Sequence, residues 1–315
     1  MIKEVRSAIM DDVPNIMSIL TSVDKLCMSN RPNLYPRPIY NENQIRDFIE
    51  NPEDGIYILV STSSSNELTG ILFYWFNEEK DHKYFTDHKE IFLVFVCVAE
   101  EYRKKGYGKM LFEHAKRLAK ENGCDHIRST VWAFDKNTYD FLSYQGAKVS
   151  SFGMEYLLTE TQNNTVTNVR AAVMNDLTEI MPILAVSDKL HRDNLPHVFK
   201  APVHTEDDVR CLIDANDTTV FVSTSPLNEI TGVLIYKVEY DVKDTKEFWI
   251  EDIAVSEFHQ RKGYGKTLFE YAKQYAHENG FDRMGVCVWE FNKAAKLFYK
   301  HLGMNEEYTS MRYIL

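Results

Sequence analysis

The sequence predicts a mixed α/β fold (mixed α+β) built from two tandem copies of one domain. Three observations predict it: a long internal repeat, the order of strands and helices within each copy, and a glycine loop that joins a strand to a long helix in both copies. A chain of 315 residues is long enough for two domains of ordinary size. A composition of 44% hydrophobic and 26% charged residues is typical of globular proteins, so each copy can bury a core.

The repeat pairs whole segments of the chain. Residues 5–12 return as 169–176, residues 66–70 as 228–232, and residues 103–109 as 260–266. The offset falls from 164 to 162 to 157 residues, which we attribute to extra loop residues in the first copy, for instance within residues 77–89. A period this long is a whole domain, because solenoid units repeat every ~20–50 residues. We therefore predict domains at 1–160 and 167–315, joined by a polar linker at 161–166.

Capping residues, terminal glycines and β-branched or aromatic runs bounded by turn residues define the elements of the second copy. In order, they are a strand at 169–173, a helix capped by Asn175 or Asp176, a helix at 206–213 behind the capping pair Thr205 and Asp208, strands at 220–224, 231–240 and 246–255, a helix at 264–279, a strand at 284–289, a helix at 293–301 and a strand at 311–315. The long helix is defined best. Leu268, Phe269, Ala272 and Ala276 recur at helical spacing, and Gly280 ends it.

The charge balance is acidic, with 36 Lys and Arg against 47 Asp and Glu and a net charge of −11. Nucleic-acid-binding proteins usually carry a basic face, so we expect no nucleic-acid partner. An acidic chain suits a cationic small molecule, but acidity also serves solubility alone.

Cysteine and histidine spacing argues against metal and disulfide frameworks. The five cysteines are scattered without a C-x-x-C pair, which indicates a reducing compartment, and the ten histidines show no metal-binding motif. Cys287 lies in a β-rich run and is predicted to be buried. No apolar run approaches 18 residues, and the N-terminus lacks a signal-peptide pattern. We expect a cytoplasmic protein with no membrane partner and no metal.

The glycine loop of the second copy, Gln260-Arg261-Lys262-Gly263-Tyr264-Gly265, lies between a strand and the long helix. A dinucleotide-binding loop requires a glycine where Leu268 stands, and a P-loop requires one at Gln260, so neither motif fits. A helix N-terminus beside Arg261, Lys262 and Lys266 suits a phosphate or pyrophosphate. The alternative is a plain strand-to-helix turn with surface lysines.

This loop resembles the acetyl-CoA-binding motif of the GNAT acetyltransferase superfamily, [Gln/Arg]-x-x-Gly-x-[Gly/Ala] after a strand. Both copies match it, as Gln260-x-x-Gly263-x-Gly265 and Arg103-x-x-Gly106-x-Gly108, and residues 250–256 and 292–304 resemble the neighbouring segments of the family. The resemblance covers nearly the whole chain, twice over. It implies two GNAT-like domains, each a bent, mostly antiparallel or mixed sheet flanked by helices and splayed between its fourth and fifth strands.

The resemblance also implies acetyl-CoA (coenzyme A) as the cofactor. Backbone N–H groups of the loop would hold the pyrophosphate, and the strand before it would pair with pantetheine and polarise the thioester carbonyl. The implied cofactor-binding residues are Ile253, Ala254, Val255, Gln260, Arg261, Lys262, Gly263, Tyr264, Gly265, Lys266 and Asn292. A second candidate cofactor site is Arg103, Lys104, Gly106 and Gly108 in the first copy.

Acyl transfer to an amine needs a group that removes a proton, because an amine with a pKa of about 10 is mostly protonated at neutral pH. Glu251 is the candidate base, acting through water, and Tyr299 the candidate acid for the leaving thiolate; the pair is similar to that of small polyamine acetyltransferases. Strand alternation places Trp249, Glu251, Ile253 and Val255 on one face and Asp252 on the other.

Each candidate has a plainer alternative. Glu251 could be a solvated or substrate-orienting charge, Asp252 a structural group or secondary substrate contact, and Tyr299 a packing residue. Asn292 could only cap the helix that follows it. Residues 188–199 lie where the family often forms its acceptor wall, so His191, Asn194 and Phe199 join Asp252 as substrate candidates, with loop packing as the alternative.

The first copy is an internal control. At the offset of 157, Glu251, Asp252, Asn292 and Tyr299 fall on Val94, Phe95, Asp135 and Leu142, while the glycine loop is retained. The first copy is therefore predicted to have lost its chemistry and to serve as a CoA-binding or scaffolding domain.

The sequence leads to one main hypothesis, an acetyl-CoA-dependent N-acetyltransferase that acts on a small, cationic amine in the C-terminal copy. Direct attack in a ternary complex is expected, because no activated nucleophile is visible. A non-catalytic acyl-CoA sensor or interaction protein and a protein-directed acetyltransferase are the alternatives. The two copies are expected to form a monomer, as an intramolecular pseudo-dimer, or a homodimer.

Overall fold

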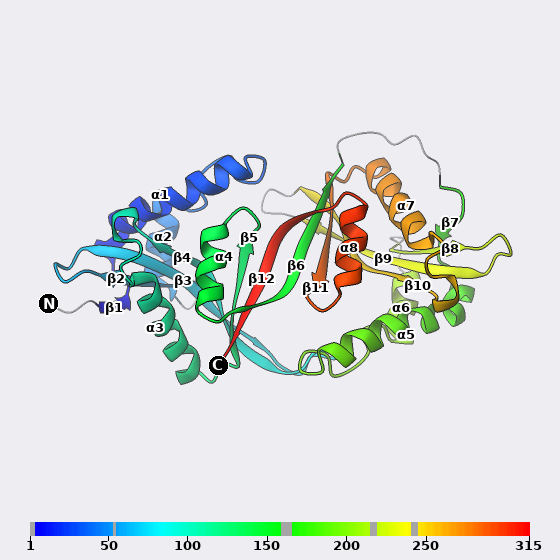
Figure 1. The fold of residues 1–315 in the computed structure, drawn as a ribbon, viewed down its shortest axis with the longest axis horizontal. Coiled ribbons are helices and arrows are strands. Elements are labelled where there is room, and N and C mark those ends of the chain that lie inside the picture. The colour runs from blue at the N-terminus through cyan, green and yellow to red at the C-terminus, as the bar shows by residue number, and fades with distance from the viewer. Residues whose placement is uncertain (1–3, 53–54, 159–165, 215–218, 241–244) are drawn as a thin grey trace. The chain divides into compact units, whose positions relative to one another are not determined.

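The computed structural model describes residues 4–52, 55–158, 166–214, 219–240 and 245–315 (Figure 1). Two compact units make up the chain. Unit 1 comprises Met1–Lys80, Asp87–Ser150 and Tyr308–Leu315, and unit 2 comprises Asp81–Thr86 and Ser151–Glu307. The mixed α/β fold class is confirmed in both. Among the described residues, no helix combines the length and apolar character needed to cross a membrane.

Unit 1 is a bent sheet with helices on its faces. Its strands lie in the order β1-β2-β3-β4-β5-β12, and all neighbours run antiparallel except β4 and β5. The elements are β1 (Glu4–Ser7), η1 (Met10–Asp12), α1 (Val13–Asn30), α2 (Glu42–Glu50), β2 (Tyr57–Thr62), β3 (Leu68–Glu79), β4 (His88–Val98), η3 (Glu100–Tyr102), α3 (Tyr107–Glu121), β5 (His126–Trp132), α4 (Lys136–Tyr144) and β12 (Asn305–Ile314).

Unit 2 repeats this arrangement with the strand order β6-β11-β10-β9-β8-β7 and one parallel pair, β10 and β11. Helix α7 packs on β8, β9 and β10, and α5 packs on β9 and β10. The elements are β6 (Lys148–Leu157), β7 (Val169–Ala171), η4 (Met174–Asp176), α5 (Leu177–Asn194), α6 (Glu206–Asp214), β8 (Val220–Thr224), β9 (Ile230–Tyr240), β10 (Lys246–Val255), η5 (Glu257–His259), α7 (Tyr264–Glu278), β11 (Arg283–Trp289) and α8 (Lys293–His301).

The units differ from the predicted domains 1–160 and 167–315 because the last strand of each copy is exchanged. Strand β12 pairs with β5 of unit 1, whereas β6, at the end of the first copy, pairs with β11 of unit 2. Residues Asp81–Thr86 of the first copy also belong to unit 2. The predicted linker, 161–166, lies outside the described residues up to residue 165.

The repeated sequence segments have the same structural roles in both units. Asp12 and Asp176 each accept two hydrogen bonds from an arginine six residues earlier, with shortest N–O distances of 2.6 Å. A Cβ on Gly232 would lie 2.8 Å from the Ala254 carbonyl oxygen, and a Cβ on Gly70 would lie 2.9 Å from that of Cys97. Glycine recurs there because neighbouring strands approach too closely for a side chain.

Two features of β10 open a space in unit 2. Its parallel pairing with β11 covers only Glu247–Ile250 and stops at Ile250 and Val286. Its register with β9 shifts between Ile250 and Asp252, so Glu251 is a bulge residue. A bulge bends its strand and locally disrupts the hydrogen-bond ladder. The bulge at Glu251 is therefore consistent with the separation of β10 from β11 after Ile250.

Candidate active site

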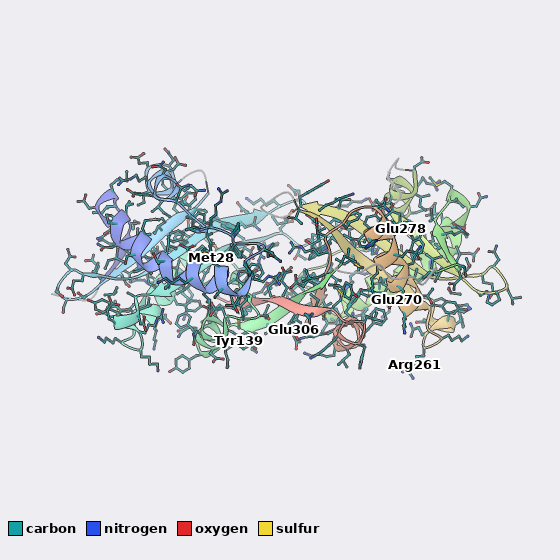
Figure 2. All side chains as sticks on the ribbon, turned by 90° about the horizontal axis from the view of Figure 1, so that it is seen from above. Met28, Tyr139, Arg261, Glu270, Glu278 and Glu306 are labelled. Carbon is teal, nitrogen blue, oxygen red and sulfur yellow. The ribbon has the colours of Figure 1, made fainter. Side chains whose placement is uncertain are left out.

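The glycine loop of unit 2 connects η5 to α7. Arg261 and Gly263 both have left-handed backbones, with φ values of 59° and 93°, and α7 begins directly after Gly263. Gln260 ties the loop to the end of β10, because its Nε2 donates to the Val255 carbonyl at 3.4 Å. Figure 2 shows Arg261 projecting outward from the loop. The first N–H groups of α7 have no intrahelical acceptor, and the positive end of the helix dipole adds to them, so the loop is an anion-binding geometry.

Unit 1 has the same loop geometry. Lys104 and Gly106 have φ values of 59° and 91°, and the Arg103 Nε donates to the Val98 carbonyl at 3.1 Å. Arg103 and Gln260 thus make equivalent bonds to equivalent strand ends. Both Arg and Gln have a side chain long enough to donate this hydrogen bond, which explains why either residue can stand at the first position of the motif.

A pocket of about 210 Å³ opens where β10 and β11 part, and all its walls come from unit 2. The separated strand edges supply Glu251–Val255 and residues 286–289, and α8 supplies Ala295 and Tyr299. The full lining is Ile183, Val186, Ser187, Leu190, His191, Glu251, Asp252, Ile253, Ala254, Val255, Gln260, Val286, Cys287, Val288, Trp289, Asn292, Ala295 and Tyr299. Most of the predicted catalytic and pantetheine-binding residues therefore meet in one place.

The bulge overturns the predicted alternation along β10. Ile253 lies opposite Leu234 and packs in the same core as Phe248 and Ile250, whereas Asp252 lies opposite Ile235. The prediction that Trp249, Glu251, Ile253 and Val255 share one face was wrong, because the bulge at Glu251 shifts the alternation by one residue. Asp252 consequently faces α5 and its histidine.

Tyr299 is a core residue that also lines the pocket. Only 6% of the residue is exposed, and its ring packs on Phe269 at a centroid distance of 6.2 Å. Burial raises the pKa of Tyr299, and the negative charge of Asp252 raises it further. The hydroxyl stays protonated and can donate to a developing anion. The nearest acidic influence on it is Asp252 rather than Glu251.

Glu251 is the more solvated of the two pocket carboxylates. Its side chain is 39% exposed, and Lys237 lies 3.6 Å from it, although Lys237 is closer to Glu239 at 2.7 Å. Exposure and a shared lysine leave most of the Glu251 charge available to a ligand, since such surface pairs are weak.

A carboxylate–histidine cluster lies behind the pocket on the α5 side. Asp188, 2% exposed, accepts hydrogen bonds from the His204 Nδ1 at 3.0 Å and from the Val203 backbone N–H at 3.1 Å. Burial alone would lower the pKa of His204, but this hydrogen bond and the charge of Asp252 raise it overall. The raised pKa favours the protonated form of His204 beside the Asp188 carboxylate.

The pKa of His191 is lowered instead. Burial lowers it, and the negative charge of Asp252 only partly opposes this effect. His191 is therefore neutral where it lines the pocket. Glu251 and Asp252 therefore bring two carboxylates to the pocket lining beside a neutral His191.

The remaining predicted residues fall into three groups. Arg261, Lys262, Gly263, Tyr264, Gly265 and Lys266 lie on the loop outside the pocket lining. Asn292 lines the pocket and also caps α8, since its Oδ1 accepts from the Ala295 backbone N–H at 3.0 Å. Asn194 is exposed at the end of α5 and donates to the Leu190 carbonyl, so the structure does not bring it to the pocket.

Phe199 and Cys287 also differ from their predicted positions. Phe199 does not line the pocket; it is buried behind His191 and Trp289, at centroid distances of 5.4 and 5.7 Å. The prediction that Cys287 is buried was wrong, because β11 loses its pairing with β10 after Val286, and Cys287 lies on that open edge, where it lines the pocket and is exposed.

Sequence reasoning missed Asp188, His204 and Trp289. One signal was available for Asp188, because it recurs as Asp24 at the offset of 164. Asp24 accepts a hydrogen bond from the Ile39 backbone, as Asp188 does from Val203, so both hold a loop that begins after the first long helix of its unit.

The equivalent region of unit 1 is aromatic. Phe95, at the position of Asp252, packs on Tyr40 and Phe73 at 5.9 Å each, and Tyr40 stands where unit 2 has His204. Leu142, at the position of Tyr299, is 1% exposed. No acidic or phenolic group replaces those of unit 2 at these positions. Among the described residues of the whole chain, no three potential metal-ligating side chains converge.

Comparison with known proteins supplies a family for this geometry. The model of the acetyltransferase (GNAT) family matches residues 20–147 and 184–304. A GCN5-related N-acetyltransferase from Sphaerobacter thermophilus has a similar structure, with a TM-score of 0.55 and 13% identity over 99% of this chain and 95% of that one. A GCN5-related glucosamine N-acetyltransferase region of a fungal multi-domain β-N-acetylglucosaminidase aligns with a TM-score of 0.51 and 14% identity over 99% of this chain and 38% of that one. No curated protein matches the chain.

Proposed function

This chain belongs to the acetyltransferase (GNAT) family, and from that membership we propose that it is an acetyl-CoA-dependent N-acetyltransferase acting on a small, cationic amine. The observation that carries the proposal is the pocket of unit 2, where a parted strand edge, two carboxylates and a buried tyrosine meet beside the glycine loop. The family supports acyl transfer, while the amine and the site within unit 2 are our inference.

The residues present fit acetyl-CoA. The left-handed loop before α7 suits its pyrophosphate, and Ile253, Ala254 and Val255 have a strand edge that β11 does not pair. When bound there, acetyl-CoA would supply an activated acetyl group. Arg261, Lys262 and Lys266 would add positive charge beside the phosphates, with Gly263, Tyr264 and Gly265 offering backbone N–H groups. The Asn292 amide nitrogen remains available, since its oxygen caps α8.

The charge of the pocket supports a cationic acceptor. Glu251 and Asp252 line it, and the lowered pKa of His191 favours a neutral imidazole that does not offset their charge. An ammonium group would be attracted in this form and must lose a proton before it can attack. We assign that proton to Glu251, through water, because its partly exposed carboxylate can pass the proton to solvent.

Tyr299 completes the reaction by donating a proton to the sulfur as the carbon–sulfur bond breaks, and it regains a proton as the attacking nitrogen loses its second proton and becomes the amide. Its protonated hydroxyl supports this role. We propose direct attack by the amine, with the new carbon–nitrogen bond replacing the thioester bond, and no acyl-enzyme. Cys287 lines the pocket and is the nucleophile that a covalent route would use, so its replacement by serine should leave turnover intact.

We assign catalysis to unit 2 alone. Unit 1 keeps the loop geometry at Arg103, Lys104 and Gly106, with Gly108 in the first turn of α3, so acetyl-CoA binding without turnover is its proposed capacity. The aromatic packing of Phe95 on Tyr40 supports this assignment, because no proton-transfer group stands at the equivalent of Asp252 or Tyr299.

Release of CoA thiol from acetyl-CoA tests the proposal across a panel of spermidine, L-lysine, glucosamine, kanamycin and a lysine tripeptide. Turnover with a small amine, reduced about 100-fold or more in Glu251→Gln and kept in Cys287→Ser, is the expected result. Turnover restricted to the peptide would favour a protein-directed enzyme. Tight acetyl-CoA binding with no turnover on any amine would contradict the proposal and favour a sensor.

A further inference from the structure

We propose that Asp81–Thr86, a segment of the first copy that we call the strap, holds the acceptor wall of unit 2 in place and sets which amines the site accepts. This inference rests on the proposed function, because it concerns the same pocket. It adds residues that lie more than 100 positions away in the chain from the site they support.

The strap is an addition to the repeat. Ten residues separate the paired positions Glu78 and Lys89 in unit 1, whereas five separate their equivalents Tyr240 and Lys246 in unit 2. The extra five residues confirm that the first copy carries a longer loop within residues 77–89. They coincide with the strap, which packs as part of unit 2 although β3 and β4 on both sides of it belong to unit 1.

Backbone hydrogen bonds fasten the strap to residues 197–201, directly after α5. The Thr86 N–H donates to the Val198 carbonyl at 2.9 Å, and the Lys200 N–H donates to the Tyr84 carbonyl at 2.9 Å. Phe85 and Phe199 form the antiparallel bridge between these bonds. The strap therefore adds a short strand to a loop that lacks other sheet partners among the described residues.

Aromatic packing connects this bridge to the pocket. The Phe85 ring lies 5.4 Å from that of Phe199, which in turn lies 5.4 Å from His191 and 5.7 Å from Trp289. His191 and Trp289 line the pocket, and Phe199 and Phe85 do not. Phe199 is 7% exposed, so removal of Phe85 would uncover the back of the wall. Phe85 is thus a positioning residue that acts through Phe199.

An ion pair also joins the middle of the strap to α6. The Lys83 Nζ lies 2.9 Å from Asp208, which faces it from the first turn of α6. Asp208 also forms a hydrogen bond with Thr205, which precedes α6 and follows His204 in the chain. The strap is therefore connected through Asp208 to the cluster of Asp188 and His204. Within the strap, the His82 Nδ1 accepts the N–H groups of Tyr84 and Phe85 at 3.1 and 3.2 Å and fixes the turn.

These contacts give the strap a specific consequence. His191 and Trp289 are the two lining residues that Phe199 supports from behind, so their positions should affect the space available to the acceptor. Loosening the wall should weaken amine binding and relax selectivity between amines of different bulk, while residues 261–266, which lie outside the pocket lining, are unaltered. In a substrate pocket, a change in fit of about one methylene group alters the discrimination between two substrates by roughly 10–200-fold.

Steady-state kinetics of the full chain test the strap. Phe85→Ala should raise KM for each active panel amine by about tenfold or more, with KM for acetyl-CoA and kcat changed less than about twofold. Phe85→Leu should restore most of the affinity, because it refills the space behind Phe199. Leu227→Ala, at an 81% exposed residue on the β8–β9 turn of the same unit, should have no effect.

A double-mutant cycle gives the decisive result. Phe199→Ala should raise KM as Phe85→Ala does, and the double variant should add little, since both act through one wall. If Phe85→Ala does not fold, Lys83→Met serves instead, with a smaller shift in the same parameter. An unchanged KM for the amine in a well-folded strap variant overturns the proposal that the strap holds the acceptor wall in place. Failure of the unaltered protein to acetylate any amine overturns the proposed function instead.

Discussion

Glu251 and Asp252 are adjacent residues with different surroundings, because Glu251 is the bulge residue of β10. Glu251 is partly exposed beside Lys237, and Asp252 faces His191 and influences Tyr299. The sequence predicted both carboxylates and the tyrosine as site candidates, and all three line the pocket. It could not show which carboxylate faces the tyrosine, because a bulge leaves no mark in an alternating pattern.

Replacing Tyr299 with phenylalanine tests its hydroxyl alone. The ring is retained, so the core with Phe269 should remain packed, and kcat should fall about 100-fold or more because the leaving sulfur loses its proton donor. Since burial raises the pKa of Tyr299, activity of the unaltered protein should rise with pH through the neutral range, as the amine deprotonates, without a fall from tyrosine ionisation.

The pH profile of kcat/KM and a thermal unfolding scan check this prediction. Tyr139→Phe, at a tyrosine of α4 that is 37% exposed in unit 1, is the matched control. A Tyr299→Phe protein that folds and retains full kcat would show that the hydroxyl has no part in catalysis.

At the scale of elements, the fourth strands of the two sheets carry the same buried glutamate in opposite electrostatic settings. Glu90 on β4 is 1% exposed and bonds to the His126 Nε2 at 2.6 Å and to Arg128 at 2.6 Å. Burial alone would raise the pKa of Glu90, but these two partners lower it well below its usual range.

Glu247 on β10 is also buried, and burial raises its pKa to about 7; Glu307 and Glu155 add to the rise, and Arg283, at 3.2 Å, does not cancel it. The two carboxylates therefore affect stability in opposite directions.

The two glutamates predict opposite pH dependences of stability. Because the folded pKa of Glu90 is depressed, its contribution is complete above pH ~4.5, the unfolded value, and is lost as the pH falls. Because the folded pKa of Glu247 is raised, its protonated form favours folding, and stability should decline as the pH rises from ~4.5 to about 7.

Glu90→Gln should cost about 3–5 kcal/mol of unfolding free energy at pH 7, as the loss of a buried partner does. Glu247→Gln should remove the decline of stability between pH 5 and 7. Hydrogen exchange measured during denaturation reports the stability of β4 and of β10 separately. A Glu247→Gln protein with an unaltered pH profile would contradict the raised pKa.

The elements show why some boundaries are readable from sequence and others are not. The helix at 293–301 and the strand at 246–255 were predicted to the residue, because Asn292 caps one and β-branched and aromatic residues fill the other. The last strand was predicted at 311–315 but spans Asn305–Ile314, because buried polar residues such as Glu307 and Thr309 hide its start.

At the scale of the whole molecule, the exchange of last strands lay beyond the sequence. Strands β6 and β12 occupy equivalent positions at the offset of 157, so either could complete either sheet. The repeat therefore fixed the number of copies but not the partner of each final strand. The strap was foreseen only as extra loop length, since its packing on unit 2 depends on contacts distant in sequence.

The central claim is that the second copy performs the chemistry that the first copy has lost. One double variant tests it most directly, Glu251→Val with Tyr299→Leu, which gives the second copy the residues that the first has at Val94 and Leu142. We predict that amine-dependent CoA release falls about 1,000-fold or more while acetyl-CoA binding persists. Turnover that continues at the rate of the unaltered protein would place the chemistry elsewhere and contradict the account.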